Sequence, residues 1–493
     1  MPKPIRKTNV VTSLVFIKYI RIIIDKLTPR AAIKGFHFGL QPALAWMAIL
    51  GLVLFSALCI LVHAGSILRI AFPLGSFAVG VILYLQYPVL YLGFTWWVWF
   101  LTPWVRRLVD YQSGWQDPSV VLLAPFLVTL VTFATFVRHF PRSYSQGGLP
   151  FVLACIAVFY SLLIGLINGA STAAVVPLLN WLTPILFGFH LFVNWRDYPS
   201  YRQNIQRTFM WCVLLTGAYG VLQYLVAPAW DRFWIISAQA IAVGNPEPRG
   251  FRVFSTMNSP GPFALVMMAG LLLLFNSQGA LRFPTSAIGY LAFLLSLVRA
   301  AWIGWLVGFI SLFTSLKSRF QIRLIITILV MGLCVLPLTT MQPFSDAINA
   351  RLQTLSKPNN DISYTQRSET YDRSLGLALS QGLGVGLGSI DRYSGLVLDS
   401  GILEMLFTMG WLGTIPYVSG IILLLFNLWK SSEGSFDPFV SAVRAISTGT
   451  LVQIVLGNVL LGLSGMIFWG FLGIAMAGNK YYQHQRTADL KRG

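Results

Sequence analysis

Long apolar runs, separated by short polar connections, dominate the pattern of hydrophobic and polar positions in this chain. Runs of this length predict helices that cross a membrane. The predicted spans are residues 42–63, 68–86, 88–104, 118–137, 149–167, 173–193, 206–226, 261–276, 284–299, 301–316, 322–340, 401–429, 439–458 and 460–478. Since two neighbouring runs can merge or re-enter from one side, about twelve to fourteen spans are predicted. The predicted fold class is an all-α polytopic membrane protein with a long outer loop that carries short helices.

The polar positions divide the chain into three regions. Residues 1–41 are basic, and within them residues 10–28 carry charges at roughly helical spacing among apolar residues. This spacing predicts an amphipathic helix on the cytoplasmic surface of the membrane. Residues 42–478 are predicted to form a single integral membrane domain, and residues 479–493 a basic cytoplasmic tail.

Composition and charge support this organisation. Of the 493 residues, 56% are hydrophobic and 10% are charged, which excludes an ordinary soluble domain of this size. The formal net charge of +19 comes from basic residues spread over the tails and short connections, so we expect a lipid bilayer and no nucleic acid as partner. The excess of positive charge on the cytoplasmic side places both termini in the cytoplasm. The segments 227–260 and 341–398 then lie on the periplasmic side.

One basic pair conflicts with this orientation. Arg106 and Arg107, followed by Asp110, fall on the outer side of the membrane. Either the two spans within residues 68–104 are miscounted, or these arginines have a reason to face the periplasm. We favour a miscount.

The stretch from Arg249 to Pro262 is polar and rich in helix breakers, and long apolar runs lie on both sides of it. Backbone of this kind in a membrane protein faces water or protein, because lipid cannot satisfy its peptide groups. Arg249 and Arg252 lie among Ser, Thr and Asn donors, and guanidinium groups pair well with phosphate oxygens. The stretch is therefore either a phosphate or pyrophosphate site, or a periplasmic turn whose arginines lie at lipid headgroups.

A further arginine, Arg299, lies between two predicted spans. Because an unpaired arginine buried in a membrane is costly, such a residue is a functional candidate. The alternative is an arginine whose side chain extends to the lipid headgroups.

The segment 341–398 is the longest hydrophilic stretch of the chain, and its positive and negative charges balance. Loops of this length usually have a function or carry short helices, and residues 366–381 are predicted to be helical. The segment ends in the glycine-rich sequence Gly382-Leu-Gly-Val-Gly-Leu-Gly388. No strand precedes this sequence, as a dinucleotide site would require, so it predicts a flexible or tightly packed backbone segment.

Four motifs, in this order along the chain, resemble those of the O-antigen ligase-like superfamily, which also contains Wzy-type polysaccharide polymerases. They are the arginine-containing stretch that ends Asn258-Ser-Pro-Gly-Pro, the sequence Val298-Arg-Ala-Ala-Trp-Ile-Gly304, the glycine-rich segment, and Asp399-Ser-Gly-Ile-Leu-Glu404 followed by Gly410-Trp-Leu-Gly413. The resemblance covers about residues 245–430.

The resemblance implies a metal-independent glycosyltransferase of the bacterial inner membrane, without a cofactor, that acts at the periplasmic face. Its donor is a glycan on a polyprenyl pyrophosphate; ligases transfer it to a lipid acceptor, and polymerases transfer it to another lipid-linked glycan. Other proteins of envelope polysaccharide assembly are expected as further partners. Preorganised positive charge stabilises a departing pyrophosphate, and Arg252 and Arg299 are the predicted catalytic arginines. The predicted substrate-binding residues are Arg249, Asn258, Arg367, Arg373 and Glu404.

The chain departs from the ligases of this superfamily at the position of the base, where they have a histidine and this chain has Asp399. A hydroxyl acceptor needs a general base within hydrogen-bond reach, and Asp399 is the predicted catalytic base. Glu404 would lie about 140° from Asp399 around a helix, so it is either a supporting partner or a structural charge. The absence of the histidine leaves ligase and polymerase both open.

A transporter of an anion or of a lipid-linked saccharide is the alternative function. Transporters carry charged residues near the middle of the bilayer, whereas the predicted spans here are nearly free of charge. The polar residues gather on one face of the membrane, which favours chemistry at that face over transport. A membrane scaffold in envelope assembly is a third interpretation.

Overall fold

The structure is a computed structural model, and it describes most of the chain. The described residues are 42–490 except 144–146, 317–320, 323, 327, 330–331, 334–339, 343, 346–347, 349–373, 390–399 and 431–436. Within these ranges the regular structure consists of helices, with one isolated β-bridge between Gly244 and Phe251, so the prediction of an all-α protein is confirmed. The predicted amphipathic helix at 10–28 and most of the segment 341–398 lie outside the described residues.

The chain divides into two units, Met1–Met47 and Ala48–Gly493. In the first unit, the structure describes only the first residues of helix α2. The rest of α2 and the other described helices belong to the second unit.

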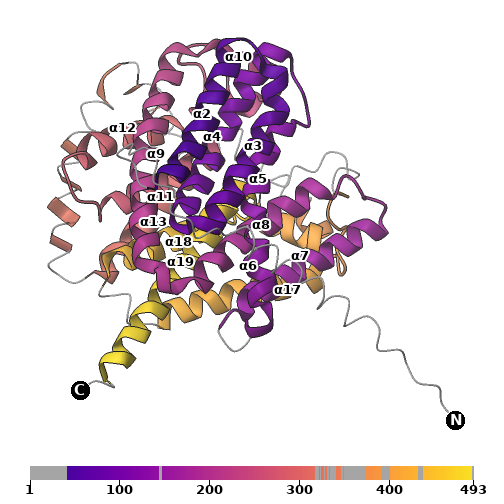
Figure 1. The fold of residues 1–493 in the computed structure, drawn as a ribbon, viewed down its shortest axis with the longest axis vertical. Helices are drawn as coiled ribbons and strands as arrows, with labels where there is room; N and C mark the ends of the chain where they lie inside the picture. The colour runs from indigo at the N-terminus through magenta and orange to yellow at the C-terminus, as the bar shows by residue number, and fades with distance from the viewer. Residues whose placement is uncertain are drawn as a thin grey trace. The chain divides into compact units, whose positions relative to one another are not determined.

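Most of the helices follow the predicted spans, because an apolar run can satisfy its backbone hydrogen bonds internally only as a helix. The predicted span 322–340 lies partly outside the described residues. In chain order they are α2 (Ala43–Leu61), α3 (Gly65–Gln86), α4 (Pro88–Ser113), η1 (Val120–Leu122), α5 (Leu123–Leu130), α6 (Phe133–His139), η2 (Phe140–Arg142), α7 (Leu149–Ile167), α8 (Val175–Val193), η3 (Trp195–Asp197), α9 (Tyr198–Val226), α10 (Ala229–Ser237), η4 (Ile241–Val243), α11 (Pro260–Leu274), α12 (Arg282–Leu295), α13 (Arg299–Ser315), α17 (Gly401–Lys430), α18 (Pro438–Val452) and α19 (Gly462–Leu490) (Figure 1).

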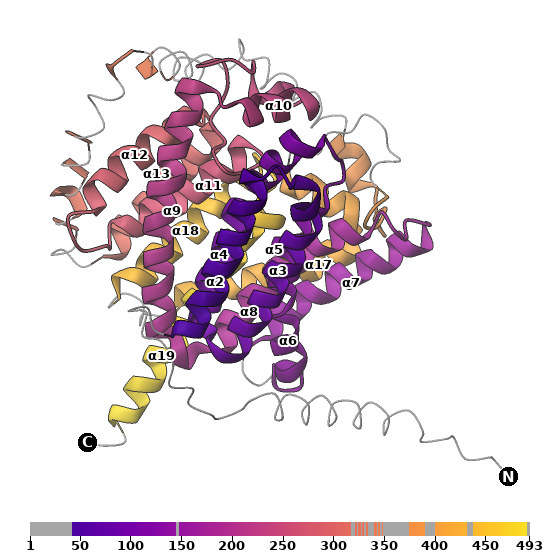
Figure 2. The same ribbon diagram turned by 45° about the horizontal axis from the view of Figure 1, so that its top comes forward.

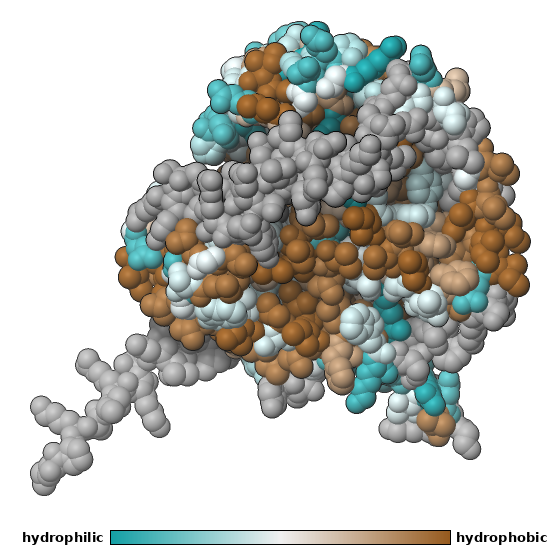
Figure 3. Space-filling model, turned by 180° about the vertical axis from the view of Figure 1, so that it is seen from behind, coloured by the Kyte–Doolittle hydropathy of each residue, from teal (hydrophilic) through white to brown (hydrophobic). Residues whose placement is uncertain are grey.

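Within the described ranges, eight helical stretches are long and apolar enough to cross a membrane. They are Ala43–Leu61, Gly65–Gln86, Val120–His139, Leu149–Ile167, Val175–Val193, Trp195–Val226, Gly401–Lys430 and Gly462–Leu490; Pro260–Leu274 and Arg299–Ser315 are apolar but shorter. Large exposed hydrophobic side chains cover the outward faces of α13 and α17, as contact with lipid requires. Figure 3 shows hydrophobic residues gathered across the middle of one face, with hydrophilic residues above them. These features are those of a multi-pass membrane protein.

Glycines bring several of the helices into close contact. Gly188 of α8 lies against Gly473 of α19, and Gly304 of α13 lies against Gly449 of α18. Small residues of this kind let the backbones of membrane helices approach closely, which compensates for the weak hydrophobic driving force between helices in lipid.

Helix α17 is broken at Gly410, whose φ of 60° and ψ of −172° are not helical. The glycine-rich segment Gly382–Gly388 lies against this break. The Val385 amide donates to the Phe407 carbonyl (2.8 Å), and the Gly386 amide donates to the Thr408 carbonyl (3.0 Å). The segment thus satisfies carbonyls that the broken helix cannot pair itself. Of the two predicted states of this segment, the tightly packed one is confirmed.

Candidate functional site

The first arginine motif folds into a tight turn against the end of α9. The amide of Arg252 donates to the Val243 carbonyl (2.8 Å), and the amide of Arg249 donates to the Tyr224 carbonyl of α9 (2.8 Å). Arg249 has a positive φ of 67° and an exposed side chain, whereas Arg252 is partly buried. The turn therefore directs the two arginines into different environments.

The guanidinium group of Arg252 joins this turn to the end of α12 through hydrogen bonds to backbone carbonyls. Its Nε donates to the Ser296 carbonyl (3.2 Å), and its two terminal nitrogens lie 3.4 Å from the carbonyl oxygens of Ala242 and Leu297. Next to it, the Val253 amide donates to the Leu295 carbonyl (3.1 Å). The motif and the end of α12 are therefore held together by both backbone and side-chain contacts.

Arg299 begins α13, directly after the break to which Arg252 binds. The break is made by Leu297, which has a positive φ of 54° and separates α12 from α13. The Arg299 side chain is partly buried. The structure thus brings the two arginine motifs together, since the Arg252 guanidinium contacts a carbonyl two residues before Arg299.

A fully buried ion pair holds the same motif from α4 and α10. Arg107 Nε lies 2.8 Å from Asp231 Oδ1, neither side chain is exposed, and the contact lacks hydrogen-bond geometry. The terminal nitrogens of Arg107 donate to the carbonyls of Ser255 and Met257, and its guanidinium lies 4.9 Å from the ring centre of Phe254. A buried charge is tolerated when it is paired and hydrogen-bonded in this way.

Asp231 and the motif are also linked through α9. Asp231 Oδ2 accepts hydrogen bonds from the Tyr219 hydroxyl (2.7 Å) and from Gln223 Nε2 (2.9 Å). Gln223 Oε1 in turn accepts from the amides of Ser255 (2.8 Å) and Phe254 (3.2 Å). Figure 2 shows α10 at the end of α9, where this network forms. Through these hydrogen bonds, the network holds the backbone of the motif in place.

The same region contains the basic pair that conflicts with the predicted orientation. The predicted spans 68–86 and 88–104 are present as α3 and α4. Arg107 contacts the motif, and Arg106 and Arg69 both bind Asp110 at 3.1 Å. Helix α4 is not among the stretches that are long and apolar enough to cross a membrane, so both interpretations, a miscount and arginines that have a reason to face the periplasm, stay predictions. Arg107 lies at the end of α4 that meets the motif and stabilises the motif through two of its carbonyls.

Asn258 lies between this network and the start of α11. Its side chain is partly buried, and its Oδ1 is buried without a hydrogen-bond partner among the described residues. Pro260 begins α11, where its fixed φ suits the first helical position. The structure places Asn258 within the motif but gives no contact that tests its predicted role in substrate binding.

Glu404 lies in the first turn of α17 and is held by the loop that follows α18. Asn458 Nδ2 donates to Glu404 Oε2, and the Gly401 amide donates to the Ile454 carbonyl (3.0 Å). Asn458 does not belong to any of the sequence motifs, so the sequence did not predict that it donates to Glu404. The pairing gives Glu404 a structural partner.

Further contacts place Glu404 at the same end of the helices as Arg299. Gln453 precedes Ile454 and packs against Gly304, which lies early in α13. The start of α17, the end of α18 and the start of α13 therefore meet. The candidate site consists of this end of the bundle together with the Arg252 turn.

Three of the predicted site residues, Asp399, Arg367 and Arg373, lie outside the described residues. Asp399 precedes Ser400, and Gly401 begins α17, so by sequence Asp399 comes directly before the helix that carries Glu404. Its role as the base stays a prediction, as do the binding roles of the two arginines.

Across the described ranges, no three His, Cys, Asp or Glu side chains gather closely enough to hold a metal ion. In comparisons with known proteins, no family model matches the chain, and no curated protein matches it either. Function is therefore inferred from the motifs and from the geometry of the site.

Proposed function

We propose that this protein is a membrane glycosyltransferase of the O-antigen ligase or polymerase type. It transfers or polymerises a glycan carried by a polyprenyl pyrophosphate, at the periplasmic face of the inner membrane. The observation that carries the proposal is the contact of Arg252 with the Ser296 and Leu297 carbonyls. This contact joins two arginine motifs that α11 and α12 separate in the sequence.

The two arginines take different roles in this proposal. The described contacts of Arg252 are with three carbonyls, so it acts as a positioning residue that sets the start of α13. Arg299 is the residue that binds the pyrophosphate. A guanidinium group held in a site with little water stabilises the charge that develops on a leaving pyrophosphate.

The reaction needs one bond to form and one to break. The acceptor hydroxyl oxygen attacks the anomeric carbon of the donor glycan, and the bond from that carbon to the pyrophosphate oxygen breaks. Asp399 takes the hydroxyl proton, and the polyprenyl pyrophosphate leaves with the bonding electron pair. Arg299 lowers the barrier by stabilising the charge on this leaving group.

Glu404 supports this site through the backbone. Its contact with Asn458 fixes the first turn of α17, which directly follows Asp399. A general base must be held in place to within a fraction of an ångström, so a rigid helix start next to it is useful.

The proposal is tested by replacing Arg299 in cells whose own copy of the gene is deleted. Arg299→Ala is expected to abolish the long surface glycan and to cause polyprenyl-linked glycan to accumulate. Arg138→Ala is the matched control, because Arg138 is an exposed arginine of α6. Single repeats on the surface acceptor indicate a polymerase, and full-length chains that stay on the carrier indicate a ligase. Wild-type surface glycan in the Arg299→Ala cells would refute the proposal.

A further inference from the structure

A second polar region lies at the opposite end of α11 and α13 from the candidate site. A cavity of about 120 Å³ opens there among Arg202, Leu272, Phe275, Asn276, Gln278, Leu312, Leu316, Leu324, Pro438 and Ala442. Helix α11 begins at Pro260, in the arginine motif, and its 15 residues end next to the cavity, so the two regions are roughly 22 Å apart. The cavity is therefore separate from the proposed glycosyltransferase site.

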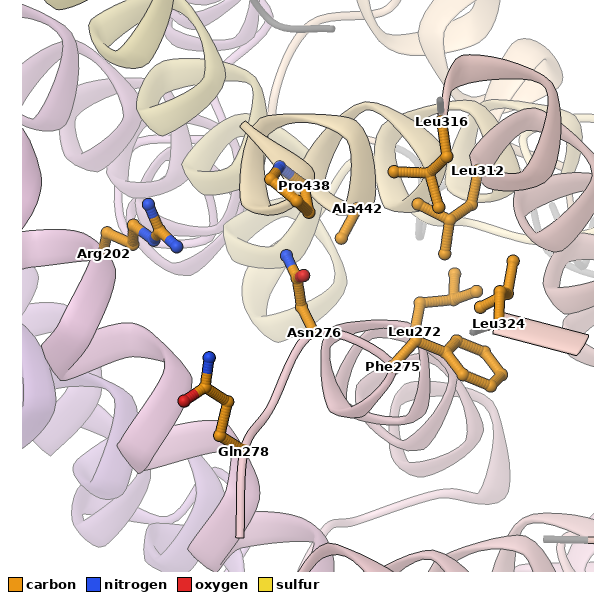
Figure 4. Close-up of a pocket in the computed structure, with 10 residues that line it drawn as sticks. All are labelled: Arg202, Leu272, Phe275, Asn276, Gln278, Leu312, Leu316, Leu324, Pro438 and Ala442. Atoms are coloured by element: carbon orange, nitrogen blue, oxygen red, sulfur yellow. The ribbon is translucent and has the colours of Figure 1, made fainter. Parts of the chain in front are cut away.

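The cavity has a polar side and an apolar side. Figure 4 shows Arg202, Asn276 and Gln278 toward one side and the leucines toward the other. Asn276 Nδ2 is buried and has no hydrogen-bond partner in the described parts of the chain. A buried amide without a partner is unfavourable unless a ligand or water accepts its hydrogen bond.

One arginine, Arg202, lines the cavity, and a second, Arg282, binds the backbone next to it. Arg202 is paired with Asp437 (3.0 Å), which also accepts hydrogen bonds from the hydroxyls of Tyr198 (2.7 Å) and Tyr482 (2.8 Å). Arg282 donates to the carbonyl of Ser277 (3.3 Å), the residue between Asn276 and Gln278 in the sequence. Among the described residues, no carboxylate pairs with Arg282.

The apolar side consists of Leu272 and Phe275 at the end of α11, Leu312 and Leu316 at the end of α13, and Leu324. These side chains form an apolar surface opposite Arg202, Asn276 and Gln278 (Figure 4). A cavity with a cation and an amide on one side and leucines on the other matches a molecule with a phosphate group joined to a hydrocarbon chain. Basic pockets between membrane helices bind lipid headgroups for this reason.

We propose that this cavity binds an anionic glycerophospholipid of the surrounding membrane. The phosphate lies near Arg202 and Arg282 and accepts a hydrogen bond from Asn276, and the start of one acyl chain lies against the leucines. The lipid phosphate accepts a hydrogen bond from the buried amide and pairs with the arginines, which neither a neutral detergent nor a free hydrocarbon does. This binding does not depend on the proposed glycosyl transfer.

Native mass spectrometry of the full chain, purified in detergent, tests the inference with phosphatidylglycerol and phosphatidylcholine as probes. The wild type is expected to retain phosphatidylglycerol in preference to phosphatidylcholine. Arg282→Ala removes one of the two arginines and Ala442→Phe fills the cavity, and both leave the Arg202–Asp437 pair intact. Arg282→Ala is expected to weaken retention about tenfold, the effect of losing one charged hydrogen bond. Ala442→Phe is expected to weaken retention because the ring takes the space of the lipid.

Two variants serve as matched controls. Arg207→Ala removes an exposed arginine of α9, and Ala57→Phe enlarges an exposed residue of α2, so both are expected to retain phosphatidylglycerol as the wild type does. Equal retention by the wild type and the two cavity variants would overturn the inference. So would displacement of phosphatidylglycerol by inorganic phosphate alone, because the cavity would then bind a free anion.

Discussion

Arg107 and Asp231 form an ion pair in which neither side chain is exposed, with 2.8 Å between Nε and Oδ1. The pair joins α4 to α10, and Arg107 also binds two carbonyls of the arginine motif. The motif that carries Arg252 is therefore supported by buried charge from two helices. This arrangement explains how a segment without regular structure keeps a defined shape next to lipid.

Arg107→Ala is predicted to destabilise the protein by about 3–5 kcal/mol, because it leaves Asp231 buried without its charge partner. The measurement is the thermal unfolding of the detergent-purified protein. Arg232→Ala, which removes an exposed arginine from the same helix as Asp231, is expected to leave unfolding unchanged. Similar unfolding temperatures for Arg107→Ala and the wild type would show that the pair does not stabilise the fold.

Arg252→Lys is predicted to lower the rate of glycan transfer while leaving the protein folded. A lysine ammonium group cannot reach three carbonyls in the fixed arrangement that the guanidinium group provides. A displacement of Arg299 by about 1 Å is enough for a loss of roughly a hundredfold. The loss is expected mainly in kcat, because the charge that Arg299 stabilises develops only as the pyrophosphate leaves. A wild-type rate for the lysine variant would exclude the positioning role.

Gly386→Ala is predicted to prevent correct packing of the glycine-rich segment. Gly386 has a positive φ of 83°, and a Cβ atom there would collide with the backbone of Gly165 in α7. Gly382→Ala is the matched control, because no atom lies within 4 Å of the added Cβ at that position. The yield of monodisperse protein on size exclusion in detergent distinguishes the two variants. Equal yields would mean that the segment tolerates side chains at this contact.

Replacing Glu404 tests whether it is a supporting partner of Asp399 or a structural charge, the two roles predicted from the sequence. A glutamine at this position still accepts the hydrogen bond from Asn458, so Glu404→Gln is predicted to keep both stability and activity. Glu404→Leu leaves Asn458 without this acceptor and is predicted to cost about 1–3 kcal/mol of stability. If Glu404→Gln is stable but inactive, the carboxylate itself takes part in the reaction.

Much of the helical architecture follows from local patterns in the sequence. The predicted spans at 149–167 and 206–226 correspond to α7 and α9, because an apolar run in lipid has no alternative to helical hydrogen bonding. The position of the break in α17 was less predictable. It depends on Gly410 and on a distant segment that pairs with the carbonyls next to it.

The residues of the candidate site were predictable in part. Arg252 and Arg299 were identified from their motifs, and the contact of Arg252 with the break before Arg299 supports the link between them. Arg107 could be singled out in the sequence because it conflicts with the orientation predicted from positive charge. Its partner Asp231 could not, because it lies on another helix far along the chain. Nothing in the sequence pattern pointed to Asn458, since its contact with Glu404 arises only when α17 and the end of α18 meet.

The most direct measurement is the release of polyprenyl pyrophosphate by the purified protein in proteoliposomes that contain polyprenyl-pyrophosphate-linked glycan as donor. We predict that the wild type and Arg138→Ala release the carrier at equal rates in the presence of a glycan acceptor. Arg299→Ala is predicted to slow release by at least about a hundredfold, as expected when a preorganised charge at the leaving group is lost. Release by Arg299→Ala at the wild-type rate would contradict the proposed mechanism.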